Sequence, residues 1–222
     1  MTTALLSTTY FGPVQWYQKL YRYDRVLLEQ CDSFIKQTYR NRCVIATTQG
    51  TQALTVPVER AAGHQTRISD HGKWRTEHWN ALCSAYGDSP FFDYYADDIQ
   101  PFFQQRWEYL FDYNLAIVRT MCSLLDIHPH IELTQTFLPP TTPSVSASDN
   151  SSPPSGGQRG QEQGLVSCID YRDAIRPKHP IPDPSFQPKP YWQVYQQKHG
   201  FLPNLSILDL LFNMGNESIF YL

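Results

Sequence analysis

The first 29 residues alternate between strand-like and helix-like patterns, and this alternation limits the possible folds more than any other part of the chain. Residues 4–9 predict a short strand. Pro13 suits the first position of a helix, and apolar side chains recur every three or four residues over 13–22. Residues 25–29 predict a second strand. A strand, a helix and a strand of these lengths form a βαβ unit, so we expect the two strands to be parallel.

The residues that follow predict a hairpin and then a largely helical region. Arms over 42–46 and 52–58 flank the turn 47–50, whose glycine can adopt a positive φ. We therefore expect an α/β fold with a small mixed sheet, an N-terminal βαβ unit, a hairpin and a helical middle region. Apolar periodicity predicts helices over 73–86, 91–104, 112–126 and 204–215, and strands over 131–133 and 218–222.

One segment differs in composition from the rest of the chain. Residues 139–164 contain 15 Pro, Gly or Ser among 26 positions. Such a segment cannot bury enough apolar surface to offset the entropy cost of ordering, so we expect a disordered insertion. Apolar elements flank it on both sides, which predicts that residues 1–222 form a single domain around it. Residues 177–190 carry six prolines and are expected to run extended along the surface.

Composition and charge exclude several classes of protein. The formal net charge is −3, so the basic excess of a dedicated nucleic-acid binder is absent. No run of about 18 apolar residues predicts a membrane span, and the first residues lack the basic start of a signal peptide. The five cysteines form no CxxC pair, which indicates reduced thiols and a cytoplasmic protein. Aromatic residues make up 14% of the chain, which excludes disorder from end to end.

None of the common catalytic motifs is present, neither the glycine-rich phosphate loops nor the serine-hydrolase and zinc patterns. The segment from Tyr39 to Arg42 is more informative. Strand alternation at the start of the hairpin would direct Arg40 and Arg42 to one side, and two guanidinium groups suit a phosphate or a carboxylate. The alternative is a pair of surface arginines bound to nearby acids. Lys19 would join them if its helix follows a strand end.

His78 is the candidate general base, because a neutral imidazole titrates near operating pH. The alternative is a hydrogen-bonded histidine at the boundary between a helix and a sheet. His71 lies seven residues earlier, which is too far along a helix for the two rings to share a metal ion. The segment from His128 to His130 closes a helix in a loop, so we expect no metal site there either.

The apolar helix predicted over 204–215 carries one carboxylate, Asp209. Within this apolar run the carboxylate must be capped, paired or catalytic, and a capping box with Ser206 is the simplest account. Asn213 lies one turn further along the same face. His199 and Asn204 lie at the entry to the helix, where either side chain could face a site.

Five segments resemble the WbqC-like protein family, and within it the uncharacterised members from Bacteroidetes-type bacteria. One departure is the end of the first strand, where Ser-Thr-Thr-Tyr replaces the family's usual His-Gln-Pro. The resemblance assigns no catalytic residues. The matching segments are 39–42 (YRNR), 54–58 (LTVPV), Trp74 with His78 and Tyr86, 90–92 (PFF) and 203–215 (PNLSILDLLFNMG).

This resemblance implies a transferase of surface-polysaccharide biosynthesis, of the O-antigen or lipopolysaccharide type. It would move an acyl or aminoacyl group to an amino sugar, expected to be nucleotide-linked. No cofactor is evident beyond an activated donor such as a thioester, with an acyl-carrier protein as a partner. The alternative is a non-catalytic protein of the same pathway that binds a nucleotide sugar or a partner protein.

As an enzyme, the chain would use a set of candidate residues drawn from these patterns and from the resemblance. The expected catalytic residues are His78 and Asp209, and the expected substrate-binding residues are Lys19, Tyr39, Arg40, Arg42, Trp74, His199, Asn204, Ser206 and Asn213.

Overall fold

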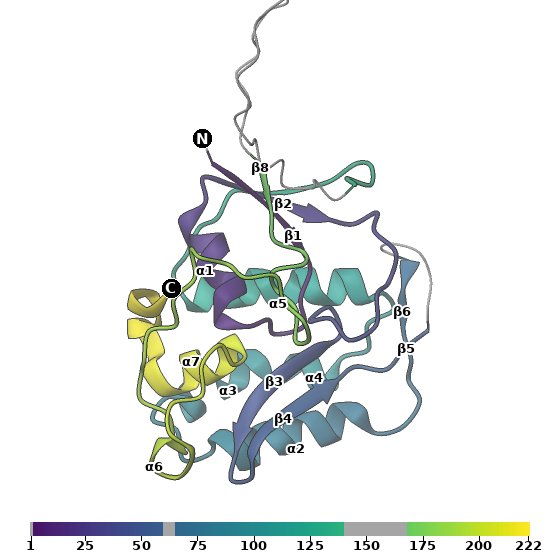
Figure 1. The fold of residues 1–222 in the computed structure, drawn as a ribbon. Coiled ribbons are helices and arrows are strands. Elements are labelled where there is room, and N and C mark those ends of the chain that lie inside the picture. Colours follow the sequence, from purple (N-terminus) through teal and green to yellow (C-terminus); the bar gives the residue numbers. More distant parts are fainter. Residues whose placement is uncertain (1, 60–64, 140–167) are drawn as a thin grey trace, which may run out of the picture.

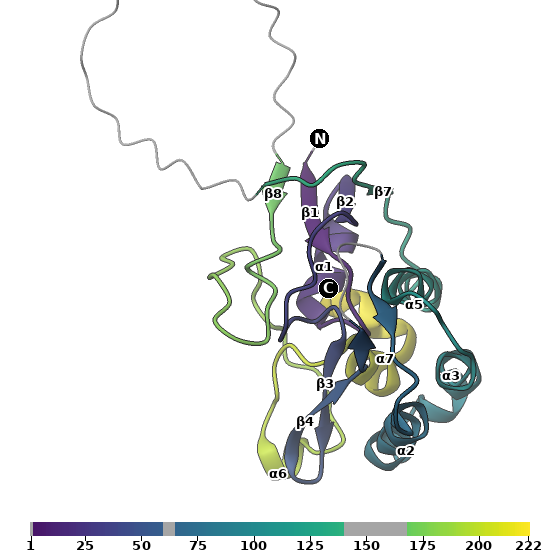
Figure 2. The same cartoon turned by 90° about the vertical axis from the view of Figure 1, so that its right-hand side faces the viewer.

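The computed structural model describes residues 2–59, 65–139 and 168–222. Within these residues, the central element is a parallel sheet of four strands that lies near the N-terminus of the chain (Figure 1), in the order β7-β2-β1-β8 (Figure 2). Helix α1 (Val14–Arg22) connects β1 to β2, and Thr3 pairs with Arg25, so the predicted βαβ unit is confirmed. The strands are β1 (Thr3–Ser7), β2 (Arg25–Glu29), β7 (Ile131–Leu133) and β8 (Cys168–Asp170).

The predicted hairpin is confirmed and forms a sheet of its own. Strand β3 (Arg42–Thr47) runs antiparallel to β4 (Gly50–Thr55), with Arg42 opposite Thr55. The α/β fold therefore keeps its parallel and antiparallel strands in separate sheets. A second, shorter antiparallel pair joins β5 (Val58–Glu59) to β6 (Arg67–Ile68).

The middle of the chain is helical, as predicted. Figure 2 shows α2, α3 and α5 along one side of the molecule, beside the strands. The continuous helix predicted over 91–104 is divided at Gln100, because Pro101 has no N–H to donate to the preceding turn. The helices are α2 (Trp74–Tyr86), α3 (Phe92–Ile99), α4 (Pro101–Gln104) and α5 (Leu110–Leu124).

Helix α7 (Ile207–Met214) is buried over almost its whole length, and the prediction of a capped apolar helix is confirmed. The Ser206 Oγ accepts a hydrogen bond from the Leu208 N–H at 3.3 Å. The strand predicted over 218–222 is wrong, because the chain continues as a 3-10 helix, η2 (Gly215–Tyr221). Gly215 turns the chain at φ 55°. The Ser218 hydroxyl lies at hydrogen-bond distance from the Gly215 and Leu210 carbonyls, and this contact holds the last residues against α7 rather than at a sheet edge.

Two segments with many prolines flank β8 in the sequence, one before it and one after it. Of the insertion predicted over 139–164, all residues except Pro139 lie outside the described part of the chain. Residues 177–190 form neither helix nor strand and are mostly exposed, as expected for a proline-rich segment. The short helix α6 (Gln196–His199) follows.

The N-terminus of α1 is capped by residues that lie nearly 190 positions later in the chain. The Val14 N–H donates to the Leu205 carbonyl at 3.0 Å, and the Gln15 N–H donates to the Asn204 Oδ1 at 2.9 Å. Asn204 has a φ of 55°, a left-handed conformation that asparagine tolerates better than most residues. Asn204 is therefore a cap for another helix as well as a turn residue before α7.

This double role predicts the effect of substitutions at Asn204. The Asn204→Ala variant loses the cap and strains the positive φ, so its free energy of unfolding should fall by about 1–2 kcal/mol. Asn204→Gly accepts the φ but lacks the cap, and Asn204→Asp retains an acceptor oxygen. Urea unfolding should rank the three variants Asp, Gly, Ala in decreasing stability. Equal stability of the Ala and wild-type chains would contradict the cap.

Candidate functional site

A cavity of about 180 Å³ lies at the carboxyl end of the parallel sheet. Most of its wall comes from three segments: residues 6–9 at the end of β1, residues within 32–40 between β2 and β3, and residues within 170–176 at the end of β8; Trp16 and Phe137 complete it. From β1 the chain proceeds to β2 and then to β7 in one direction, whereas β8 lies on the other side of β1. Such a reversal of strand order opens the crevice in which open α/β sheets bind ligands.

Three arginines line this cavity, one from the β2–β3 segment and two from the β8 segment. Arg172 donates from Nε to both carboxylate oxygens of Asp170, at 3.0 and 3.1 Å, and from Nη2 to Oδ2 at 2.6 Å. Arg40 donates to the Ser33 carbonyl at 2.8 Å and also forms an ion pair with Asp32. Arg176 and Asp173 form the third ion pair. The cavity therefore contains three guanidinium groups and three carboxylates.

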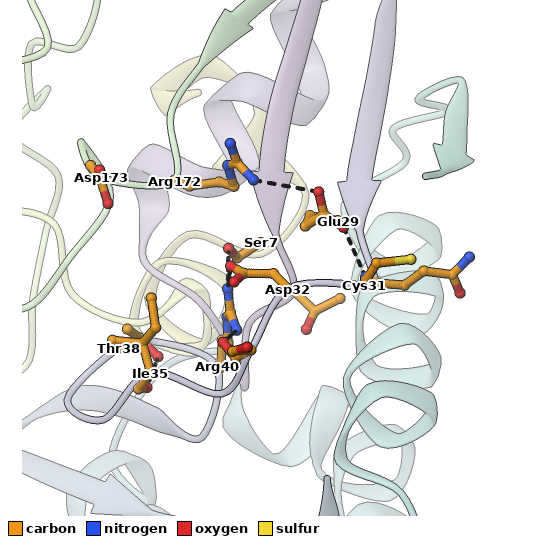
Figure 3. Close-up of polar contacts among 12 residues, drawn as sticks. Ser7, Glu29, Cys31, Asp32, Ile35, Thr38, Arg40, Arg172 and Asp173 are labelled. Carbon is orange, nitrogen blue, oxygen red and sulfur yellow. Dashed lines mark hydrogen bonds and ion pairs between the residues drawn. The ribbon is translucent and has the colours of Figure 1, made fainter. Parts of the chain in front are cut away.

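A buried carboxylate holds the strand ends in position from behind the cavity. The Glu29 side chain has no exposed surface, and its Oε2 lies 3.4 Å from Arg172 Nη1. It also accepts hydrogen bonds from the Cys31 N–H, the Thr134 hydroxyl and the Leu138 N–H, at 2.8, 2.8 and 3.0 Å. Figure 3 shows Arg172, Ser7 and Arg40 in succession beside these strand ends. Glu29 thus connects the ends of β2, β7 and β8.

The remaining wall of the cavity combines aromatic and aliphatic side chains with the hydroxyl groups of serine and threonine. Trp16, Tyr39, Phe137 and Tyr171 contribute rings. The Arg172 guanidinium lies 5.8 Å from the centre of the Phe137 ring, within the range of a cation–π contact. The Arg40 Nη2 also donates to the Ser7 Oγ at 3.0 Å, which draws the end of β1 into the wall. The cavity therefore combines ion pairs with flat apolar surfaces.

Two of the predicted substrate-binding residues, Tyr39 and Arg40, line the cavity. The structure does not bring Arg42 to them. Strand β3 begins at Arg42, so strand alternation does not extend back to Arg40, and the Arg42 Nε instead donates to the Thr55 hydroxyl on the neighbouring arm at 3.1 Å. Lys19 lies outside the wall and is buried, with its Nζ 2.6 Å from Asp183 Oδ2 and 4.6 Å from the centre of the Tyr171 ring.

His78 and Trp74 lie in the hydrophobic core and not in the cavity wall. The His78 Nδ1 and the Tyr10 hydroxyl are hydrogen-bonded at 2.9 Å, and the Trp74 ring lies 5.3 Å from the His78 ring. Burial lowers the pKa of His78 from 6.5 to about 4. The imidazole therefore stays neutral in the native protein at physiological pH, surrounded by aromatic rings.

The Asp209 carboxylate is also in the core, where three side chains donate to it. The Tyr86 hydroxyl, the Tyr191 hydroxyl and the Gln193 amide lie at 3.0, 2.6 and 2.9 Å from its oxygens. Burial raises the pKa of Asp209. Its carboxylate therefore faces these three donors, so the capping box predicted with Ser206 is not formed, and Ser206 caps α7 alone.

The other candidates at the C-terminal end have structural contacts. The Asn213 amide donates to the Asp209 carbonyl at 2.7 Å, and the Ser206 hydroxyl donates to the Phe11 carbonyl at 2.7 Å. His199 is half-buried, with its Nε2 3.2 Å from the Thr48 carbonyl at the hairpin turn. With the Asn204 cap, these contacts hold α7 and its entry segment in place.

Sequence reasoning missed most of the residues that form the cavity. The strand over 168–170 was not predicted, so the polar residues after it received no role. Polar side chains directly after a strand of a parallel sheet are a usable signal, since these positions gather at one edge. The missed residues are Ser7, Asp32, Asp170, Arg172, Asp173 and Arg176.

Over residues 2–59, 65–139 and 168–222, no group of three or more His, Cys, Asp or Glu side chains is placed to hold a metal ion. The carboxylates of the cavity face guanidinium groups instead. In the same part of the chain, no helix has the length and apolar character needed to cross a membrane.

These features define an α/β protein with a charged ligand cavity at the carboxyl edge of a parallel sheet. The family model described as WbqC-like protein family matches residues 8–147, so the chain belongs to the WbqC-like protein family. The uncharacterised protein Rv1507c of Mycobacterium tuberculosis is 28% identical over 219 residues, which cover 90% of this chain and 87% of that protein. No solved structure matched the chain.

The burial of His78 predicts a dependence of stability on pH. Below pH 6.5 the unfolded chain binds a proton at this residue, whereas the native protein binds it only near pH 4. The free energy of unfolding should therefore decrease as the pH falls from 6.5 to 4, by about 3 kcal/mol for this group. In the His78→Gln variant this contribution should be lost, whereas the control His71→Gln, at an exposed position, should retain it. Unfolding curves at several pH values test this, and an unchanged slope in His78→Gln would contradict it.

The buried position of Arg172 predicts that its ion pairs matter for folding. Arg172→Ala leaves Glu29 and Asp170 with an uncompensated charge, so unfolding should become about 3–5 kcal/mol easier. Adding Glu29→Gln to that variant should restore part of the loss. The control Arg25→Ala breaks a pair with Glu132 whose side chains are both 38% exposed, and should change the stability far less than Arg172→Ala, because water screens such a pair. Similar losses in the two single variants would contradict the buried network.

Proposed function

We propose that the protein binds a phosphate-bearing sugar in the arginine-lined cavity and transfers an acyl or aminoacyl group to its amine, in surface-polysaccharide biosynthesis. One observation carries the proposal: Arg40, Arg172 and Arg176 converge on one small cavity at the reversal of strand order. The planar guanidinium group presents paired donors that fit phosphate and carboxylate oxygens. Membership of the WbqC-like family supports the pathway assigned here.

The chemistry of the transfer follows from the proposed substrate. The amine nitrogen attacks the carbonyl carbon of an activated donor such as a thioester carried by an acyl-carrier protein. A C–N bond forms, the C–S bond breaks, the thiolate leaves, and the amine loses a proton. Asp173 is the best-placed acceptor for that proton, because its side chain is 43% exposed whereas those of Asp32 and Asp170 are 14% and 15% exposed. General-base assistance of this kind contributes about 10²–10⁴-fold to the rate.

His78 is a less suitable base than Asp173. Its Nδ1 is engaged by the Tyr10 hydroxyl, and it lies outside the cavity wall. A base must lie within hydrogen-bond reach of the proton that it removes.

A second candidate function is binding of the same sugar without turnover. Each of the three carboxylates that line the cavity is paired with an arginine. A paired carboxylate is a weaker base than a free one, because the neighbouring cation stabilises its charged form. This pairing favours a binding protein of the same pathway.

Binding and turnover can be measured separately. Sugar phosphates should raise the melting temperature of the wild-type protein, and Arg176→Gln should weaken their binding by about 10–100-fold, because it removes charge-assisted hydrogen bonds. The matched control Arg119→Gln changes an exposed arginine on α5 and should leave binding unchanged. Binding accompanied by acylation of an amino sugar supports the transferase, and binding without it supports the second candidate. The absence of any shift with sugar phosphates or nucleotide sugars would contradict both.

A further inference from the structure

We infer that the cavity selects a zwitterion the size of a single sugar, in particular an amino sugar phosphate with a free ammonium group. The inference rests on the proposed function and specifies its substrate. It follows from three properties of the cavity: the balance of its charges, the difference in exposure among its ion pairs, and its volume.

The charges of the cavity wall are balanced. Arg40, Arg172 and Arg176 are each paired with one of Asp32, Asp170 and Asp173. An anion that binds to the paired Nη2 group of one of these arginines separates the arginine from its carboxylate, and that carboxylate is then left without a partner at a partly buried position. Such a group carries a desolvation cost. A ligand that brings an ammonium group together with its phosphate supplies a new partner for the carboxylate, so both members of the separated pair are satisfied.

One of the three pairs is free to separate. The Arg172 side chain is 7% exposed and is also held by Glu29, while the Arg40 side chain is 11% exposed and is also held by Ser7 and Ser33. The Arg176 side chain is 31% exposed and Asp173 is 43% exposed. In the described part of the chain, the Arg176 Nε is buried without a hydrogen-bond partner. Arg176 therefore has an unused donor, and its pair with Asp173 is the one that a ligand can open.

The volume of the cavity limits the size of the ligand. It measures about 180 Å³, whereas sites for drug-sized ligands span about 300–1,000 Å³. A sugar ring matches the size of the cavity, but a complete nucleotide sugar is larger than the cavity. The aromatic wall formed by Trp16, Tyr39 and Tyr171 provides flat apolar surfaces for the faces of such a ring.

The zwitterion also fits the direction of the proposed transfer. The bound ammonium group first loses a proton to the solvent, because only the neutral amine can attack the donor carbonyl. Acylation then gives a neutral amide, while the thiolate leaves and Asp173 accepts the second proton. The product then lacks the cation that Asp173 requires, so Asp173 returns to Arg176 and the product binds more weakly than the substrate. The Arg176–Asp173 pair thus favours binding of the amine substrate over binding of the amide product.

Calorimetric titration of the full-length protein with four matched ligands tests the inference. Glucosamine 6-phosphate carries both charges, glucose 6-phosphate only the anion, glucosamine only the cation, and N-acetylglucosamine 6-phosphate is the acylated form. We expect glucosamine 6-phosphate to bind at least about tenfold more tightly than the other three. If glucose 6-phosphate binds equally well, the selection of a zwitterion is refuted, while the proposed binding of sugar phosphates stands. If none of the phosphates binds, both are refuted.

Two further probes separate the possible sources of the zwitterion and the limit on size. Serine, an amino acid zwitterion, should bind more weakly than glucosamine 6-phosphate. Tighter binding of serine would support selection of a zwitterion but would refute a sugar as the ligand. Uridine diphosphate N-acetylglucosamine should bind more weakly than glucosamine 6-phosphate, and tighter binding would refute the size limit.

Substitutions in the separable pair give opposite expectations for the two charges. Asp173→Asn removes the ammonium partner and frees Arg176, so glucosamine 6-phosphate should lose about tenfold in affinity while glucose 6-phosphate keeps or gains affinity. Arg176→Gln should weaken both ligands. Asp112→Asn, at an exposed position on α5, is the matched control and should change neither. Equal losses of both ligands in Asp173→Asn, with an unchanged melting temperature, would overturn the assignment.

Discussion

The structure depends on one set of backbone contacts, made where the chain enters α7. Over residues 204–206, the Leu205 carbonyl and the Asn204 side chain cap α1, and the Ser206 N–H donates to Val44 of the hairpin at 2.8 Å. The next N–H, of Ile207, donates to the Gly12 carbonyl of the β1–α1 loop at 2.8 Å. Four consecutive residues thus join the βαβ unit, the hairpin and the buried helix, which are distant in sequence.

These contacts also determine how the protein can recognise an anion. In many α/β proteins a phosphate binds to the free N–H groups at the start of the first helix. Here the first two N–H groups of α1 are already occupied by residues 204 and 205. Charge recognition at this sheet edge is therefore left to side chains, and Arg40, Arg172 and Arg176 are the side chains that face the cavity. The same contacts that stabilise the fold account for a site built from guanidinium groups.

Local patterns in the sequence predicted the elements that fold from local information. The βαβ unit, the hairpin and the Ser206-capped helix all have short-range signals, such as apolar periodicity, a turn glycine or a capping hydroxyl. The strand β8 has only three residues, and its role comes from pairing with β1, more than 160 positions earlier. Residues 218–222 have a strand-like composition, but Gly215 turns them against α7. In both cases tertiary contacts determine the secondary structure, and the residue pattern of a single segment carries no information about those contacts.

The candidate site shows the same division between local and distant information. Asp209 attracted attention because a polar group in apolar surroundings is costly, whereas His78 was considered as a general base and Lys19 as a further cation beside the arginines. In the structure all three side chains are buried with specific partners. The partners, such as Tyr86 for Asp209 at a separation of 123 residues, are invisible to local reading. Burial of an unusual polar residue is thus a reliable inference from sequence, whereas a catalytic role is a further step that needs an accessible surface.

The pairing of charges in the cavity explains how the site is compatible with a stable fold. Three unpaired guanidinium groups around a cavity of about 180 Å³ would repel one another, and three unpaired carboxylates would do the same. Interleaving the two kinds of group removes this repulsion in the free protein, and Glu29 fixes the most buried arginine. A ligand anion that displaces a carboxylate from its arginine should therefore be accompanied by a cation that pairs with the displaced carboxylate. A site assembled in this way gains selectivity from the pairs that already stabilise it, and the most exposed pair, Arg176 with Asp173, is where that exchange costs least.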